Sequence, residues 1–212
     1  MRGTVEIFVR SPDHMRVDTF AFGNLVSSMI SNGERFTLLQ GTQYLVGPAR
    51  PCVAQQLLGI PMEAREVVAV LTGGAPLLSD RLHAPRWVNG FYVVDVEGPS
   101  GSSEQIELEL PNDQRDLPIE RQTPRLHRVV LRDGQGVRAE ITYQGYRDVQ
   151  GTPFPDRVRI VMPRDHADTQ IRFDEVVPNF TVPANPDDPG AAPPDPFEQR
   201  RPNGAEEIPI RC

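Results

Sequence analysis

The chain has 212 residues, a formal net charge of −7 at pH 7 and a hydrophobic fraction of 38%. This length accommodates one domain with a sizeable core, or one domain and a tail. The acidic balance argues against nucleic acid and anionic membrane surfaces as main partners. No apolar run approaches the length of a membrane-spanning helix, and residues 1–20 lack the pattern of a signal peptide.

The first part of the chain, residues 3–46, alternates apolar and polar side chains. Val5, Ile7 and Val9 alternate with Glu6 and Arg10, and a polar turn follows at 11–14. Asn32-Gly33 is a strong signal for a two-residue hairpin. The sequence therefore predicts an antiparallel meander over residues 3–46.

A helical segment interrupts the strands at residues 48–76. A short helix is predicted from Pro51 to Leu58 and ends at Gly59. A second helix is predicted to hold Pro61 in its first turn and to stop at residues 73–76. Its one apolar face is formed by Ile60, Ala64, Val67, Val68 and Leu71. Its valines favour strands, so we expect this helix to be held by packing against a sheet.

Strands resume after Trp87 and continue to about residue 179. The expected strands are 88–96, 104–110, 125–132, 136–144, 156–163 and 169–177. Val158, Ile160 and Met162 alternate with Arg157 and Arg159, as in a strand with one buried and one charged face. The fold class predicted from these patterns is mainly β, with a curved antiparallel sheet and a short helical lid.

Residues 181–212 differ in composition from residues 1–180. They are rich in Pro and Asp, which is typical of an extended or disordered tail without a core of its own. Phe197 and the terminal residues 208–212 could dock back on the body. We therefore expect two parts, a domain at 1–180 and a tail at 181–212.

The two cysteines, Cys52 and Cys212, lie far apart in the sequence. Without a CxxC motif or a nearby histidine they do not indicate a metal site. A disulfide that pins the tail to the body is one interpretation, and it would require an oxidising compartment. Two separate thiols are the other, and the spacing leaves both open.

The sequence gives no pattern of an enzyme. Its histidines lie in separate segments without metal-ligand spacing: His14, His83, His127 and His166. Ser27-Ser28 lie in an expected strand rather than in the sharp turn that a nucleophile needs. A hydrolase would require a serine and a histidine within hydrogen-bond reach, which nothing in the pattern indicates. We therefore expect no catalytic residue, no metal and no cofactor.

The apolar face of the sheet is either plain core or the wall of a cavity for an acyl chain. The cavity candidates on the sheet are Val17, Leu25, Met29, Phe36 and Leu38. Those on the helical lid are Leu57, Val67, Val70 and Leu71, of which Val70 lies off the main stripe and could mark a second face. Trp87 could line the mouth of such a cavity or belong to the core.

Three ordered segments resemble the lipoprotein carriers and receptors of the Lol pathway, the receptor branch (LolB-like) more than the carrier branch (LolA-like). Ala21-Phe22-Gly23 resembles the family's Pro-apolar-Gly turn, with Ala21 in place of the proline. Residues 58–76 resemble its Gly-x-Pro helix that ends in Leu-x-Gly-x-Pro. Residues 143–146, 154–155 and 171–179 resemble its closing strands.

The resemblance implies an incomplete, half-open β-barrel with helices as a lid over an apolar cavity. It implies a monomeric, non-enzymatic periplasmic protein that takes acyl chains of a lipoprotein or lipid from a periplasmic carrier protein. The resemblance also implies that the protein delivers this cargo to the inner leaflet of the outer membrane. Phe22 occupies the position of the protruding apolar residue that the family uses for delivery. The receptor branch also has a signal peptide, a lipidated N-terminal cysteine, a helix and a first strand. Residues 1–212 show none of these, so we expect the native N-terminal segment to be missing.

A second hypothesis is a scaffold domain with a solid core that binds a partner protein through its Pro-rich tail. A dry, filled interior together with a partner-bound tail would favour it. The two hypotheses differ in whether the apolar face accepts a ligand.

Overall fold

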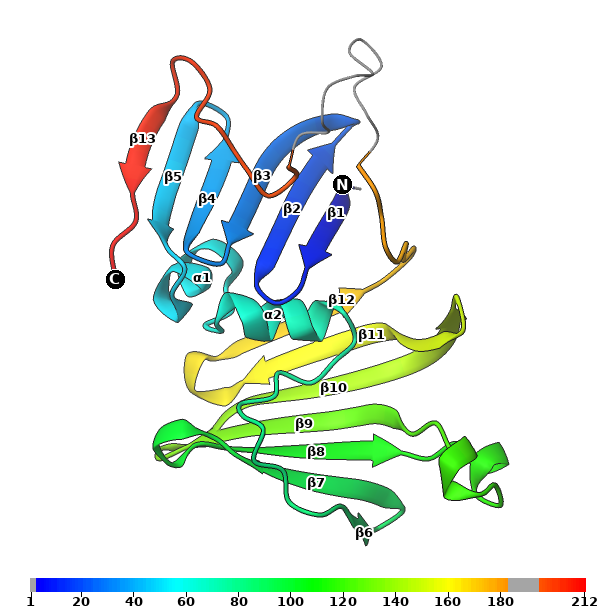
Figure 1. Cartoon of the computed structure of the whole chain (residues 1–212). Helices are drawn as coiled ribbons and strands as arrows, with labels where there is room; N and C mark the ends of the chain where they lie inside the picture. The colour runs from blue at the N-terminus through cyan, green and yellow to red at the C-terminus, as the bar shows by residue number, and fades with distance from the viewer. Residues whose placement is uncertain (1–2, 183–194) are drawn as a thin grey trace. The chain divides into compact units, whose positions relative to one another are not determined.

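The computed structural model describes residues 3–182 and 195–212 (Figure 1). The expectation of an extended or disordered tail falls partly on residues 183–194, which lie outside the described residues. The chain divides into two compact units. The first comprises Met1–Thr72 and Asn179–Cys212, and the second comprises Gly73–Pro178.

The first unit contains a six-stranded sheet, called sheet 1 below, with the order β1-β2-β3-β4-β5-β13. The meander predicted over residues 3–46 is confirmed, because consecutive strands from β1 to β5 pair in antiparallel fashion. At the edge beside β5, the last strand of the chain pairs in parallel. The bounds are β1 (Gly3–Arg10), β2 (His14–Ala21), β3 (Asn24–Asn32), β4 (Arg35–Gln40), β5 (Gln43–Pro48) and β13 (Glu206–Pro209).

The described residues contain two α-helices, both in the first unit. The short helix is confirmed as α1 (Pro51–Leu58), with Gly59 as its left-handed C-cap. The second helix is α2 (Ala64–Leu71), and the prediction that it would hold Pro61 in its first turn is wrong. Glu63 is the N-cap of a capping box, and its own N–H donates to Glu66 Oε2 at 2.9 Å. This reciprocal cap satisfies the first free N–H groups only if the helix begins after Glu63.

Both helices pack on sheet 1, as the helix propensities require. α2 contacts β1 and β2, whereas α1 contacts β4 (Figure 1). Val53 of α1 lies so close over Gly47 of β5 that a Cβ atom at Gly47 would come within 3.1 Å of it. All five residues of the predicted apolar stripe of the second helix are buried.

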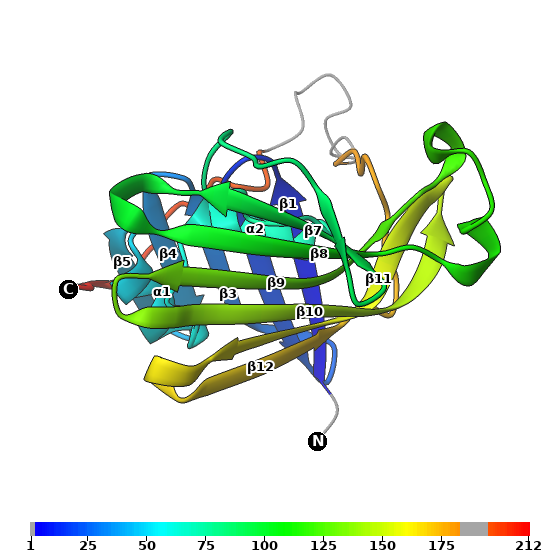
Figure 2. The same cartoon turned by 90° about the horizontal axis from the view of Figure 1, so that it is seen from below.

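The second unit contains a seven-stranded antiparallel sheet, sheet 2, with the order β12-β11-β10-β9-β8-β7-β6 (Figure 2). Five of the six predicted strands match within a few residues, and the last is shorter than predicted because it ends at Arg172. A short additional strand, β6, forms the edge. The bounds are β6 (Arg86–Val88), β7 (Phe91–Glu97), β8 (Ser103–Glu109), β9 (Arg125–Asp133), β10 (Gly136–Val149), β11 (Thr152–Met162) and β12 (Ala167–Arg172).

The segment that follows α2 is fixed to sheet 2 by buried polar groups. The Tyr143 hydroxyl donates to the carbonyl of Gly74 at 2.7 Å, and the buried carboxylate of Glu104 accepts the N–H groups of Leu77 and Leu78. Burial raises the pKa of Tyr143 well above its usual value, so the hydroxyl keeps the proton that it donates. These bonds satisfy polar groups that would otherwise be costly to bury.

The predicted fold class is confirmed: the protein is mainly β, with open antiparallel sheets and a short helical part. Among the described strands, each sheet has two different edge strands, so neither sheet closes on itself. In sheet 2, Val158, Ile160 and Met162 are buried and the alternating Arg157 and Arg159 are exposed, as the pattern predicts.

Candidate apolar binding face

Three of the predicted cavity residues meet in one row across sheet 1. Val17 of β2 is the register partner of Met29 of β3, and Met29 is the partner of Leu38 of β4. Residues paired in register point to the same face, so these side chains are neighbours. The complete row, called the apolar row below, consists of Ile7, Val17, Met29, Leu38, Leu45 and Ile208.

The next row toward the helices is packed except at the β1 edge, where Val9, the partner of Met15, is half-buried. Phe36 lies two residues before Leu38 on β4 and so shares its face, and it pairs with Ser31 and Gly47. Phe36 and Met15, which also pairs with Ser31, are completely buried. This end of the face is therefore closed core, consistent with Val53 of α1 lying over Gly47.

The apolar row itself is only partly covered. Met29 is buried, with 4% of its side chain exposed, whereas Val17, Leu38, Leu45 and Ile208 are half-buried and Ile7 at the β1 edge is 36% exposed. The row beyond it consists of Val5, Thr19, Ser27, Gln40, Gln43 and Glu206, so it is polar except at the β1 edge and ends in a carboxylate. The face thus passes from filled core through a partly open apolar strip to a polar margin. An apolar chain on this strip would cover side chains that water now contacts.

Leu25 does not belong to this row, contrary to the expected alternation. A β-bulge shifts the register after Thr19, and Leu25 pairs with Phe20. Phe20 follows the alternation of Arg16 and Asp18, which is opposite to that of Val17. Because a one-residue shift exchanges the faces of a strand, the bulge removes Leu25 from the face of Met29. Its side chain is 47% exposed.

The predicted lid residues are distributed over both helices. Leu57 of α1 is half-buried, whereas Val67, Val70 and Leu71 of α2 are buried. Val70 lies off the apolar stripe and is nevertheless 1% exposed. α2 is therefore buried along a second side as well as along the predicted stripe.

Trp87 lies in the second unit, on the edge strand β6. Its ring packs edge-on against Tyr92 with 4.7 Å between centroids. The side chain is 51% exposed, so Trp87 is not a core residue. The structure thus places it in a different unit from the other predicted cavity residues.

Phe22 stands at the tip of the turn between β2 and β3. Its backbone adopts φ +53°, in the left-handed region that non-glycine residues seldom occupy. The side chain is 83% exposed, so it is not folded back on the core. Leu25 and Val26, just after the turn, are also exposed. Together they form an apolar tip, a kind of surface that often contacts a partner or a membrane.

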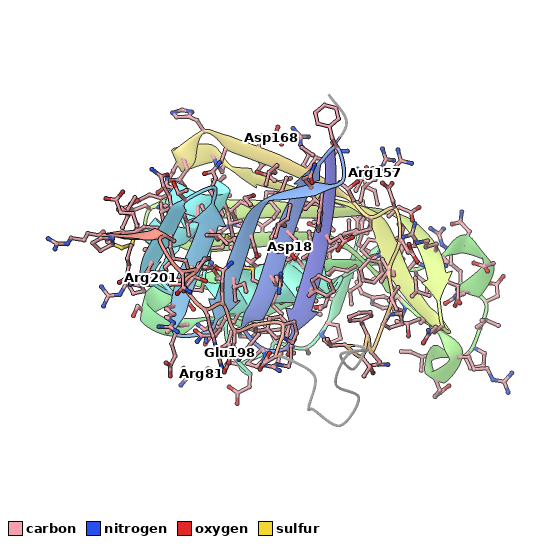
Figure 3. The ribbon with its side chains drawn as sticks, turned by 90° about the horizontal axis from the view of Figure 1, so that it is seen from above. Asp18, Arg81, Arg157, Asp168, Glu198 and Arg201 are labelled. Carbon is pink, nitrogen blue, oxygen red and sulfur yellow. A yellow bond between two sulfur atoms is a disulfide. The ribbon has the colours of Figure 1, made fainter. Side chains whose placement is uncertain are left out.

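The opposite face of sheet 1 is covered by the end of the chain. Residues 195–201 cross this face, where Figure 3 labels Asp18, Glu198 and Arg201. Gln199 accepts a hydrogen bond from Thr37 Oγ1 at 3.0 Å through its side chain, and its backbone carbonyl accepts the Tyr44 hydroxyl at 2.9 Å. No local sequence signal pointed to Gln199, because these bonds join residues more than 150 positions apart.

Phe197 is buried between charged neighbours on the same face. The Arg10 guanidinium lies 4.6 Å from the centre of its ring, and Arg10 also pairs with Asp195 at 3.2 Å. The pKa of Asp195 is lowered first by the N–H of Phe197, which donates to its carboxylate, and then by Arg10. Residue 197 therefore anchors the segment to sheet 1, as the sequence suggested that it could.

A disulfide between Cys52 of α1 and Cys212 holds the end of the chain. Just before it, the N–H of Ile210 donates to the carbonyl of Val46 at 2.7 Å, continuing the pairing of β13 with β5. The side chain of Ile210 is buried. Residues 195–212 are thus bound to sheet 1 by side chains, a strand and a covalent link.

Two hollows, one in each unit, are lined mainly by charged and polar side chains. Neither hollow includes a side chain of the apolar row. Across the part of the chain that is described, no three His, Cys, Asp or Glu side chains are placed to hold a metal ion. None of the helices described is both long and apolar enough to cross a membrane.

No model of a protein family matches the sequence, and no curated protein matches it. Among solved structures, the chain is similar to a LolA superfamily protein from Nitrosomonas europaea, with 9% identity and a TM-score of 0.48 over 78% of this chain and 72% of that one. It is also similar to a DUF1329 family protein from Desulfovibrio piger, with 12% identity and a TM-score of 0.50 over 80% and 73% of the two chains. The first likeness is too distant to carry an argument. The second shows a common fold alone.

Proposed function

We propose that the protein is a non-enzymatic periplasmic binding protein that holds the acyl chains of a lipoprotein or lipid on the apolar row of sheet 1. The observation that carries this proposal is the apolar row, in which Met29 is buried but the other five side chains are partly open to water, beside the closed core at Phe36 and Met15. The row has one apolar residue on each of the six strands, so it forms a continuous apolar strip across the sheet.

The energetics suit an acyl ligand. Burial of each methylene group contributes about 0.8 kcal/mol, so an acyl chain gains affinity with every carbon that it lays on the strip. The neighbouring row, from Val5 to Glu206, contains no arginine, so binding on this face would depend on apolar contact.

Release into a membrane requires a second contact, which we assign to the turn at Phe22. The exposed ring lies with Leu25 and Val26 at the end of β2 and β3. In this role it inserts among the lipids of the inner leaflet of the outer membrane after the acyl chains have been received from a periplasmic carrier protein. The disulfide supports the proposed compartment, because such bonds persist in the oxidising periplasm.

The test compares two variants on neighbouring residues of β4. Leu38 and Leu39 are both half-buried leucines, but Leu38 lies in the apolar row and Leu39 pairs with Ser28 and Tyr44 on the opposite face. Wild type, Leu38→Glu and Leu39→Glu are purified without detergent from a host with an outer membrane. Native mass spectrometry and lipid extraction then measure the co-purified acylated species.

Acylated lipoprotein or phospholipid bound to wild type and to folded Leu39→Glu, but absent from folded Leu38→Glu, supports the proposal. A lipid-free wild type that also ignores added fluorescent fatty acid refutes it. That result favours the solid-core scaffold, for which the complete burial of Phe36 and Met15 is the supporting observation.

A further inference from the structure

Two arginines face each other directly near the edge of sheet 2. Arg157 of β11 is the register partner of Arg172 of β12, so their side chains extend from the same face at the shortest cross-strand spacing. Figure 3 shows Arg157 pointing away from the ribbon. Like charges placed directly opposite are destabilising, unless an anion lies between them.

Two other arginines of the same face are neutralised by carboxylates of the sheet. Arg159 makes two hydrogen bonds to Asp168 on the adjacent strand, and Arg128 binds both oxygens of Glu140. Arg157 has no ion pair among the described residues. Arg172 reaches Asp174 at 3.4 Å, but these side chains are 76% and 90% exposed, so that pair contributes little.

The arginine pair borders a hollow within the second unit. Its lining residues are Arg147, Asp156, Arg157, Arg172, Phe173 and Asp174. Arg147 is held in place by Asp156 Oδ1 at 2.9 Å and by the carbonyl of Phe173 at 2.9 Å. The charge of Asp156 therefore offsets that of Arg147, and the charge of Asp174 weakly offsets that of Arg172. The lining keeps one net positive charge, and the guanidinium groups of Arg157 and Arg172 can donate hydrogen bonds to a ligand.

We propose that this hollow binds a phosphate group, with Arg157 and Arg172 as its paired donors. Guanidinium groups bind phosphate oxygens through parallel, charge-assisted hydrogen bonds. The phosphate could belong to a lipid headgroup or be free in solution, since both present the same oxygens. The site lies apart from the apolar row in sequence and in unit, and its test does not depend on acyl binding.

The experiment measures thermal unfolding and isothermal titration of the full chain with inorganic phosphate. Phosphate should raise the unfolding temperature of wild type, because a ligand that binds only the folded state stabilises it. In Arg157→Gln/Arg172→Gln we expect the affinity to fall about tenfold or more. Arg159→Gln/Arg164→Gln is the matched control, because it removes two arginines that are paired with Asp168 and Asp133.

A second arm identifies the source of the phosphate. Flotation with phosphatidylcholine vesicles, with and without phosphatidylglycerol, is compared for the same three proteins. Binding to phosphatidylglycerol vesicles that depends on Arg157 and Arg172 supports a lipid headgroup, and binding of inorganic phosphate alone supports a free anion. The proposal is overturned if wild type binds neither probe, or if the control double variant loses as much affinity as Arg157→Gln/Arg172→Gln.

Discussion

The two sheets follow the same alternation of apolar and polar residues, yet their apolar faces are buried to different degrees. In sheet 2, Leu131, Ile141 and Val158 are completely buried. In sheet 1, Met15, Phe36 and Met29 are buried as well, but Val17 and Leu38 are half-buried and Ile7 is more exposed still. Alternation thus identifies an apolar face without saying how completely it is covered. This difference is why we place the ligand on sheet 1.

The polar faces differ as well. Sheet 2 pairs several of its charges within the sheet, as in Arg128 with Glu140 and Arg159 with Asp168, whereas Arg157 has no ion pair among the described residues. Sheet 1 has fewer charges on its polar face and is covered instead by residues 195–201. The covering of sheet 1 depends on a distant part of the chain. It can therefore be weakened without disturbing the ion pairs of sheet 2.

Removal of the disulfide should have the largest effect on stability, and this effect should be confined to sheet 1. The bond closes a loop across 160 positions, and its loss in Cys52→Ser/Cys212→Ser is expected to cost about 4 kcal/mol of unfolding free energy. Denaturant unfolding with hydrogen exchange should show the loss in β5 and β13 rather than in sheet 2. Reductant should destabilise wild type but leave the double variant unchanged, and equal effects of reductant on both proteins would contradict the account.

Truncation of matched apolar residues compares the two faces directly. Ile141→Ala in sheet 2 should cost about 3 kcal/mol, because it leaves a cavity in a filled face. Leu38→Ala in sheet 1 should cost about 1 kcal/mol, because its side chain already contacts water. Urea unfolding of both variants measures the difference. A cost for Leu38→Ala equal to that of Ile141→Ala would show that the apolar row is ordinary filled core.

On the charged face of sheet 2, the stability difference between wild type and Glu140→Gln should depend on pH. Hydrogen bonds from Arg128 lower the pKa of Glu140 below its ordinary value of 4.5. A carboxylate with a lowered pKa stabilises the fold above the unfolded pKa, and this contribution is lost as pH falls through the folded pKa. Glu140→Gln should therefore be less stable than wild type at pH 7 by about 1 kcal/mol.

The difference between wild type and Glu140→Gln should shrink below about pH 4.5. Thermal unfolding at a series of pH values measures it, with Glu109→Gln as an exposed control that has the same change of charge. A difference that stays constant down to acid pH would rule out the ion pair as its origin.

The smallest effect is expected on the segment that covers sheet 1. Tyr44→Phe removes the hydrogen bond to the carbonyl of Gln199 and should cost about 0.5 kcal/mol. Limited proteolysis should then cleave within residues 195–205 faster than in wild type. Tyr92→Phe removes a comparable hydroxyl contact from sheet 2 and should leave that rate unchanged; acceleration by both variants would count against a local effect.

Much of the fold could be predicted because its signals are local. Alternation specified most of the strands, and Gly59 and Gly73 specified where the helices stop. The start of α2 was misplaced because Pro61 suits a first turn, whereas the capping box of Glu63 and Glu66 begins the helix later. β13 was not predicted as a strand, because four residues that pair in parallel with a distant β5 carry no periodic signal.

The site was predictable to the same extent. Val17, Met29 and Leu38 share a row because alternation and hairpin pairing keep them in register. Leu25 was assigned to the wrong face because the bulge after Thr19 leaves no mark in the residue pattern. The contacts of Gln199 and the pairing of Arg157 with Arg172 depend on register or on distant folding, which composition does not reveal.

The most direct test of the central claim is crosslinking of a fatty acid that carries a photoreactive group in its acyl chain. After irradiation, peptide mapping by mass spectrometry locates the attachment points on the full-length protein. We expect crosslinks at the partly exposed residues of the apolar row, above all Val17, Leu38 and Leu45. These crosslinks should be lost in Leu38→Glu but not in Leu39→Glu. Crosslinks confined to sheet 2 or to residues 195–212 would contradict an acyl-binding face on sheet 1. The same conclusion would follow from a crosslink yield no higher than that of a control protein without an apolar row.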